Sequence, residues 1–327
     1  MTVVTSHSTS YADDARAAVS KTSTDDDGLS AFMSVRPRLF GIAYRMLGSR
    51  ADAEDVLQDA WLRWHEQDSS QLRSTEAWLT TMVTRLAIDR LRSAKTQRAS
   101  YFGPWLPEPL AEVEIVTPES HAEFASDLSV AFMHLLERLG EEERAAFVLH
   151  DVFDCDYDDI AETLGKTAAA CRQLVHRARE RVATERRRFR VDEEKRIGML
   201  NRFMEAAQSG DFNAIKSMFA PDARMTSDGG GKAVAVIRPL DGADRIARLW
   251  WAISRRPEAP GIERRLVRIN GETGLAFYFK GRLHSISTID TDGERIYSYY
   301  SIANPDKLRV FKQKQGLPVT PPAARAS

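Results

Sequence analysis

The 327-residue sequence contains very little cysteine, with only Cys155 and Cys171. Two cysteines are too few for a disulfide framework, and their spacing is not that of a CxxC redox or zinc pair. No stretch approaches the ~18 consecutive apolar residues of a membrane span, and the N-terminus is rich in Ser, Thr and Asp where a secretory signal needs an apolar core. These absences predict a cytoplasmic protein without membrane association, disulfides or a bound metal.

Charge of one sign is not in excess either. The 46 basic and 47 acidic side chains give a formal net charge of -1, which argues against a uniformly basic coat for nucleic acid but leaves local segregation open. Hydrophobic residues at 43% and charged residues at 28% lie near globular averages, so most of the chain can bury cores. At roughly 100–200 residues per domain, the length fits two or three domains.

Changes in residue pattern divide the chain. Helical periodicity appears twice, separated by a proline-bearing stretch, and it gives way after Asp192 to alternating segments with Asn-Gly and Asp-Gly turns. Segments poor in large apolar residues cannot offset the entropy of ordering. The predicted order is a disordered leader (1–28), a helical domain (29–98), a linker (99–126), a second helical domain (127–190), an α+β domain (193–312) and a disordered tail (313–327).

The most specific local signal is a helix-turn-helix between Tyr157 and Val182. Ile160 lies on an inward face, Gly165 supplies the permissive turn, and Thr167 can cap the second helix. Cys171 occupies a helix-packing position, so we expect a core residue and not a redox sensor.

Arginine dominates the second helix of this motif, with eight arginines against two glutamates between Arg172 and Arg190. Arginine pairs bidentately with guanine edges and phosphates, and glutamine can pair with adenine. Because turn, cap and arginine face coincide, DNA binding is favoured over a solvated helix that merely ends a bundle. The predicted DNA-contacting residues of this motif are Thr167, Arg172, Gln173, His176, Arg177 and Arg179.

The first helical domain places an acidic helix before a basic one. Carboxylates in a first helical turn favour the macrodipole, which explains Asp52 in GSRADAEDVLQDAWLRWHE but not Gln58 and Asp59. In the following STEAWLTTMVTRLAIDRLRSAKTQR, aromatic and apolar residues pack inward. Its basic residues are Arg85, Arg90, Arg92, Lys95 and Arg98.

At this point the sequence resembles the extracytoplasmic-function sigma factors of bacterial RNA polymerase. ADAEDVLQDAWLRW resembles their core-polymerase-binding helix, and AWLTTMVTRLAIDRLRS resembles the helix that reads and opens the downstream promoter element. LERLGEEERAAFVLHDVFDCDYDDIAETLGKTAAACRQLVHRARERV resembles the domain that reads the upstream element. The resemblance covers about residues 30 to 188 and implies two all-α sigma domains without a helical linker domain between them.

The resemblance also implies roles for individual residues and for the chain. Many members carry asparagine where this chain has Arg85, so base preference in the downstream element departs from the family pattern. The implied function is to bind core RNA polymerase, through the clamp helices of its largest subunit and its flap, and to direct initiation at -35 and -10 promoter elements. The residues implied to dock on the clamp helices are Asp55, Leu57, Gln58 and Asp59. Those implied to contact the downstream promoter DNA are Arg85, Asp89 and Arg92.

Three short motifs narrow the resemblance to members with a C-terminal SnoaL/NTF2-like domain, an α+β cone. They are WLPEPL at 105–110, DGGGK at 228–232 and NPDKL at 304–308. The implied consequence is control of transcription in cis, without the need for a separate anti-sigma factor. The predicted interdomain contacts are Trp105, Leu106, Pro107, Asp228, Gly229, Gly230, Gly231, Lys232, Asn304, Pro305, Asp306, Lys307 and Leu308.

The sequence gives less support to other functions of the C-terminal domain. The acid-base candidates Asp228, Asp241, Asp244 and His284 have no partner at a spacing that fixes geometry. DGGGK is not a phosphate-binding P-loop, because Thr226 and Ala233 stand where such a loop needs glycine and Ser/Thr, and no cofactor is predicted. The alternative hypothesis is a helix-turn-helix regulator, or an enzyme, fused to an NTF2-like domain that binds an unknown small molecule.

Overall fold

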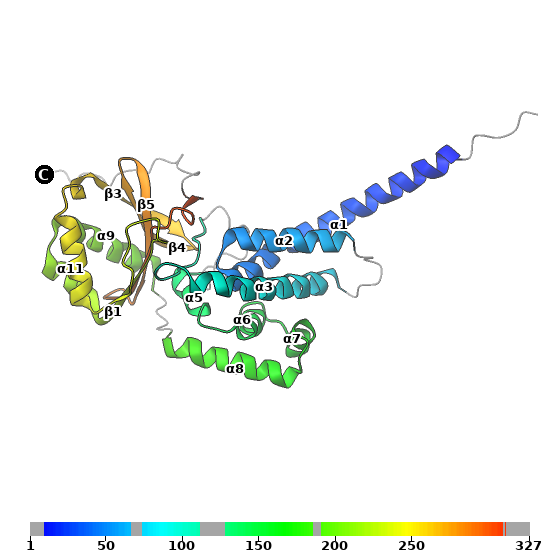
Figure 1. The fold of residues 1–327 in the computed structure, drawn as a ribbon, viewed down its shortest axis with the longest axis horizontal. Coiled ribbons are helices and arrows are strands. Elements are labelled where there is room, and N and C mark those ends of the chain that lie inside the picture. The colour runs from blue at the N-terminus through cyan, green and yellow to red at the C-terminus, as the bar shows by residue number, and fades with distance from the viewer. Residues whose placement is uncertain (1–9, 67–73, 112–127, 186–190, 310, 312–327) are drawn as a thin grey trace, which may run out of the picture.

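The computed structural model describes residues 10–66, 74–111, 128–185, 191–309 and 311. A helical half and a half built around a sheet lie side by side, and the N-terminal part of α1 extends away from both (Figure 1). Among the described residues, no helix is both long enough and apolar enough to cross a membrane.

The first helical domain consists of three helices, α1 (Ser10–Leu47), α2 (Arg50–His65) and α3 (Thr75–Ala99). Leu39, Leu79 and Val83 are fully buried where these helices pack together. The start of α1 corrects the predicted leader over residues 1–28, because the helix already begins at Ser10. Alanines at 12, 15, 17 and 18 give this segment a high helix propensity, which the prediction from apolar content ignored. Residues 1–9 lie outside the described part.

The second helical domain packs directly on the first, and their buried side chains form one continuous cluster. Arg144 illustrates the contact, since its buried guanidinium donates to the carbonyl of Met46 at 2.6 Å and to Glu137 at 2.7 Å. The elements of this domain are α5 (Val130–Leu136), α6 (Glu141–Phe147), the π-helical turn η3 (Val148–Val152), α7 (Tyr157–Leu164) and α8 (Ala168–Glu185).

The C-terminal domain is the α+β cone that the resemblance implied. Its six strands run in the order β2-β1-β6-β5-β4-β3, with β1 and β6 parallel and the other pairs antiparallel. The predicted Asn270-Gly271 turn joins β3 to β4, and Asp292-Gly293 joins β5 to β6. The elements are α9 (Glu193–Ser209), α10 (Phe212–Met218), β1 (Phe219–Asp228), β2 (Leu240–Asp241), α11 (Ala243–Ser254), the 3-10 turn η4 (Ala259–Gly261), β3 (Ile262–Ile269), β4 (Glu272–Phe279), β5 (Arg282–Thr291) and β6 (Ile296–Ile302).

The two faces of this sheet have different neighbours. One face packs on α9 and α11 around Phe203, Trp250 and Tyr299. The other face packs on the helical half, where buried Ile286 and Ile302 share a cluster with residues of the linker and of α5. Both faces of the sheet are therefore covered, one within the domain and one between domains.

The linker and the tail are described only in part. Residues 100–111 of the predicted linker follow the end of α3, run along the C-terminal domain and contain no helix or strand. Residues 112–127 and the predicted tail over 313–327 lie outside the described residues.

Candidate functional site

The predicted helix-turn-helix is confirmed in its local geometry. Gly165 ends α7 in the left-handed conformation, at φ 63°. The hydroxyl of Thr167 accepts the amide of Ala170 at 3.2 Å and so caps α8. Cys171 and Ile160 are fully buried between the two helices, as expected for core residues.

The N-terminal half of α8 presents a polar face to solvent. Arg172, Gln173 and His176 are exposed, and the Arg172 guanidinium lies 5.1 Å from the ring centre of Tyr157. Side chains at positions i, i+1 and i+4 share one side of a helix, so these three can approach a base-pair edge together. This face has the residue types and the exposure that groove reading requires.

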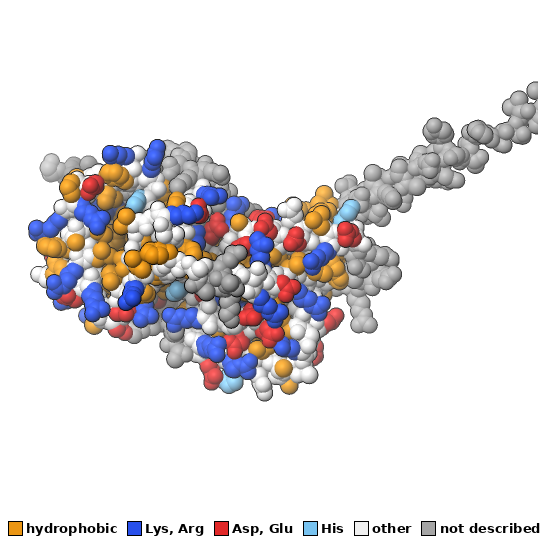
Figure 2. Space-filling view, in the orientation of Figure 1, with side chains coloured by type: hydrophobic (Ala, Val, Ile, Leu, Met, Phe, Trp, Pro, Cys, Tyr) orange, Lys and Arg blue, Asp and Glu red, His pale blue; other side chains and the backbone are white. Residues whose placement is uncertain are grey.

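Two other predicted DNA contacts are paired inside the domain. Arg177 donates to Glu143 of α6 at 3.0 Å. Arg179 makes two bonds to Asp151 of η3, at 2.8 and 2.7 Å. Such exposed pairs contribute little energy, and both arginines remain about half exposed, at 49% and 53%. Acidic and basic side chains are interspersed on this part of the surface (Figure 2).

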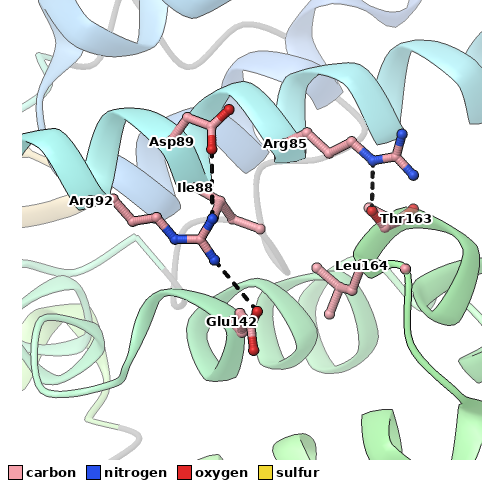
Figure 3. A pocket seen from close by; sticks show the side chains of 8 residues that line it. Arg85, Ile88, Asp89, Arg92, Glu142, Thr163 and Leu164 are labelled. Carbon is pink, nitrogen blue, oxygen red and sulfur yellow. Dashed lines mark hydrogen bonds and ion pairs between the residues drawn. The ribbon is translucent and has the colours of Figure 1, made fainter.

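The face of α3 that is predicted to read the downstream element lies beside the second helical domain, and its side chains Arg85, Asp89 and Arg92 remain exposed. Arg85 donates to the carbonyl oxygens of Thr163 and Glu162, both at 2.8 Å, at the C-terminal end of α7. Arg92 forms ion pairs with Asp89 on its own helix and with two glutamates of α6 (Figure 3). These side chains line a cleft of about 330 Å³ between the two domains. Arg85 and Arg92 therefore contact the helix-turn-helix domain, whereas Asp89 pairs with Arg92 on its own helix and points away from that domain (Figure 3).

The predicted polymerase-docking residues of α2 separate into two groups. Gln58 and Asp59 are exposed, and Asp55 is exposed although it pairs with Arg90 at 3.0 Å. Leu57 is only 2% exposed and packs in the core, which corrects its predicted direct contact with polymerase. Leu62, on the same helix, is 55% exposed.

The interdomain motifs meet around one buried carboxylate. Asp228, at the end of β1, is fully buried and accepts hydrogen bonds from the Tyr101 hydroxyl at 2.6 Å, the Leu106 amide at 2.9 Å and the Lys307 ammonium at 2.7 Å. The Lys307 ammonium also donates to the Leu106 carbonyl. Burial lowers the pKa of Lys307 to about 8, against the opposing charge of Asp228. We call these four residues the Asp228 hub.

Trp105 of WLPEPL lies between two cations. The Arg98 guanidinium and the Lys307 ammonium are each 4.0 Å from its ring. A side chain at Gly48, whose φ is +64°, would place its Cβ 2.5 Å from this ring, so glycine permits the close approach. Trp105 is therefore anchored to the first helical domain and to the C-terminal domain at once.

The remaining motif residues support the hub. Gly230 and Gly231 have positive φ, and a Cβ at Gly230 would collide with Asn304 and Tyr101. Lys232 pairs with Asp306 at 2.5 Å, which joins DGGGK to NPDKL. Of the predicted contacts, Pro107, Gly229 and Leu308 are buried and Pro305 is half-buried.

Asn270 is an interdomain residue, although its sequence context predicts only a turn. It is fully buried, and its carboxamide accepts the Leu110 amide at 2.7 Å while donating to the Tyr44 hydroxyl at 2.9 Å and the Leu128 carbonyl at 2.7 Å. One side chain thus joins the C-terminal domain to the first helical domain, the linker and the start of the second helical domain. An Asn-Gly turn gives no sequence signal for such contacts.

The acid-base candidates of the C-terminal domain are not brought together. Asp241 pairs with Arg224, Asp244 pairs with Lys216 and Arg248, and His284 is exposed on β5. The fourth, Asp228, belongs to the hub. Within the part of the chain that the structure describes, no group of three or more His, Cys, Asp and Glu side chains could hold a metal ion.

Comparisons with known proteins identify the family of this chain. Residues 31–97 match the model of Sigma-70 region 2, and residues 129–182 match that of Sigma-70, region 4. The ECF RNA polymerase sigma factor SigJ of Mycobacterium tuberculosis is 36% identical over 86% of this chain and 93% of its own length. The chain belongs to the extracytoplasmic-function sigma factors. The probable sigma factor SigI of the same organism is 27% identical over 90% of this chain and 99% of its own.

The crystal structure of SigJ extends the likeness to the whole architecture. It superposes with a TM-score of 0.69 at 35% identity and covers 86% of this chain and 98% of its own. As a sigma factor, the protein binds core RNA polymerase, recognises the -35 and -10 promoter elements and directs transcription initiation. The alternative of a conventional regulator or an enzyme is not favoured, because region 2 is present with region 4.

Proposed function

We propose that this sigma factor is held by its C-terminal domain in a closed arrangement, in which regions 2 and 4 restrict each other's access to promoter DNA. The observation that carries the proposal is Arg85. Arg85 lies on the face of α3 that the family resemblance assigns to promoter DNA. Both of its hydrogen bonds go to backbone carbonyls of region 4. Reading by α3 then requires region 4 to move away.

The C-terminal domain stabilises this arrangement from one side. Asn270 contacts Tyr44 of region 2 and Leu128 at the start of region 4, and the hub fastens the linker between them. Because the domain is tethered, even a weak contact acts at an effective concentration of about millimolar. A separate anti-sigma partner is then not required for control. A signal that loosens the contacts would release the two DNA-reading domains.

In the open state, regions 2 and 4 are separated. Solvent exposure indicates which residues then contact DNA and polymerase. Arg172, Gln173 and His176 read the -35 element in the major groove, and Gln58 and Asp59 dock on the clamp helices of the largest polymerase subunit. Once region 4 has moved away, the -10 element is contacted by Arg85, Asp89 and Arg92. The flap of core RNA polymerase is the second polymerase element that the sigma factor contacts.

A reversible crosslink tests whether the closed arrangement restrains transcription. The hydroxyl oxygens of Thr81 on α3 and Thr163 on α7 lie 3.0 Å apart, so Thr81→Cys with Thr163→Cys brings two thiols together across the cleft. With purified core polymerase, the oxidised protein is expected to lose promoter-dependent transcription and to regain it on reduction. Thr81→Cys alone, under the same oxidant, controls for Cys155 and Cys171. Equal transcription by the oxidised and reduced double variants would contradict the proposal.

A further inference from the structure

Arg172 is held differently from the other arginines of α8, the second helix of the helix-turn-helix. Among the described residues of α8, the arginines that form ion pairs with carboxylates are Arg177, Arg179 and Arg181. Arg172 is exposed near the start of the helix, and its guanidinium lies over the ring of Tyr157, 5.1 Å from the ring centre. Tyr157 is the first residue of α7 and is half-buried. An aromatic ring therefore orders Arg172, where carboxylates order the other three.

This difference decides which hydrogen-bond donors remain available to DNA. An arginine that pairs with a carboxylate uses some of its N–H groups for that pair, and its charge is neutralised. An arginine that lies over a ring makes a contact that needs no acceptor atom. Its N–H groups can therefore still pair with the O6 and N7 atoms of a guanine. The Tyr157 ring thus restricts the long side chain of Arg172 without occupying the groups that read a base.

Tyr157 is itself supported by a second ring. The imidazole of His150, on η3, packs against Tyr157 with ring centres 4.2 Å apart. The Nδ1 atom of His150 donates to the carbonyl oxygen of Cys155 at 3.2 Å, which fixes the imidazole to the loop before α7. A π-helical turn such as η3 is rare and often occurs at functional sites. A continuous series of contacts therefore runs from η3 through Tyr157 to Arg172.

We propose that Tyr157 is a positioning residue for promoter recognition, which holds the Arg172 guanidinium in the orientation that pairs with a guanine of the -35 element. The proposal rests on the reading role proposed for Arg172 and adds the residue through which Arg172 is oriented. Gln173 and His176 share the exposed face of α8, but among the described residues it is Arg172 that contacts the Tyr157 ring. The influence of Tyr157 should therefore be confined to the base that Arg172 reads.

Transcription from a promoter library by the reconstituted holoenzyme tests the proposal. Each base of the -35 element is varied in turn, and base preference is measured with the full-length wild type and its variants. Arg172→Ala identifies the base pair that Arg172 reads, because the preference for guanine there should fall about tenfold. Tyr157→Leu should lower the preference at that base pair alone, by about twofold to fivefold, as expected for an exposed cation–π contact.

Two further variants separate the ring from other effects of Tyr157. Tyr157→Phe keeps the ring and should retain the base preference of the wild type. Tyr157→Leu combined with Arg172→Ala should show the same preference as Arg172→Ala alone, because the ring then has no guanidinium to orient.

Asp151→Asn is the matched control. Asp151 follows His150 on η3 and holds Arg179, on the same helix α8, through its carboxylate. Its replacement disturbs the same turn and the same helix but leaves the contact between Tyr157 and Arg172, so the preference at the base pair read by Arg172 should not change. His150→Leu keeps the test informative if Tyr157→Leu lowers the helical content. It leaves Tyr157 in place without its supporting ring, and it should lower the same preference by less than Tyr157→Leu does.

Four results would overturn the positioning role alone. Tyr157 is structural if Tyr157→Leu and His150→Leu lower transcription equally from every promoter of the library. The hydroxyl, and not the ring, is responsible if Tyr157→Phe behaves like Tyr157→Leu. Additive losses in the double variant would show that Tyr157 acts independently of Arg172, and an equal loss in Asp151→Asn would show that any change in η3 has this effect. An unchanged base preference in Arg172→Ala is a separate result, which would overturn the reading role of Arg172 and the positioning role with it.

Discussion

Replacement of Asn270 by glycine tests how the C-terminal domain holds the linker. Asn270 has a φ of 52°, so glycine keeps the turn without strain and removes only the carboxamide. Three side-chain hydrogen bonds disappear, to Leu110, Tyr44 and Leu128. At about 1 kcal/mol for each bond, the docked state loses about 3 kcal/mol, which corresponds to about a hundredfold in the docking equilibrium.

Hydrogen exchange of the linker measures this loss, because the Leu110 amide is protected only while it donates to Asn270. Amides of residues 100–111 are expected to exchange about a hundredfold faster in Asn270→Gly. Lys280→Gly is the matched control, since Lys280 has a φ of 50°, precedes Gly281 in another hairpin turn and is exposed. If both variants exchange equally, Asn270 does not hold the linker, and the closed arrangement loses its main support. In a purified transcription system, only Asn270→Gly should alter promoter activity.

Three further predictions concern the two sigma regions and their contact with the C-terminal domain. Arg172→Ala should cost on the order of 1–3 kcal/mol of promoter binding and relax base preference in the -35 element, so an unchanged base-preference profile would refute its reading role. Gln58→Ala with Asp59→Ala should weaken binding to core polymerase while helical content stays intact, and an unchanged affinity in a pull-down would argue against the docking role. Burial beside Tyr300, with the charge of Arg138, lowers the pKa of His134 from 6.5 to about 4. The undocked state then binds more protons between these values, so docking should weaken as pH falls from 6.5 towards 4, a dependence that His134→Leu should remove from the hydrogen-exchange profile.

Turns and helix caps could be predicted from the sequence wherever the residue type determines the local backbone conformation. Gly165 and Thr167 form the turn and cap expected of them, and Asn270-Gly271 forms a hairpin turn. Each of these depends on a positive φ or on a side-chain oxygen near a free amide, and both effects act over a few residues. The order of the domains followed from the same kind of local pattern.

Features that depend on packing between distant segments were not readable. Leu57 belongs to an acidic helix, but its burial is decided by the neighbouring helices α1 and α3. The contacts of Asn270 reach residues 226, 160 and 142 positions away, which no local pattern encodes. Leu62 differs from Leu57, because it is an apolar residue of the same helix that remains exposed at the surface.

The composition of the Asp228 hub has a consequence for reversibility. The two charged members, Asp228 and Lys307, both belong to the C-terminal domain, and the linker contributes only a phenol and backbone groups. When the linker leaves, water can replace its neutral groups, and the ion pair stays together. Opening therefore does not strand a lone charge, which is the expensive step in breaking a buried salt bridge. The linker can therefore leave and rejoin the Asp228 hub repeatedly at a modest energetic cost. The affinity of the linker for the hub should depend little on the ionic strength of the cell.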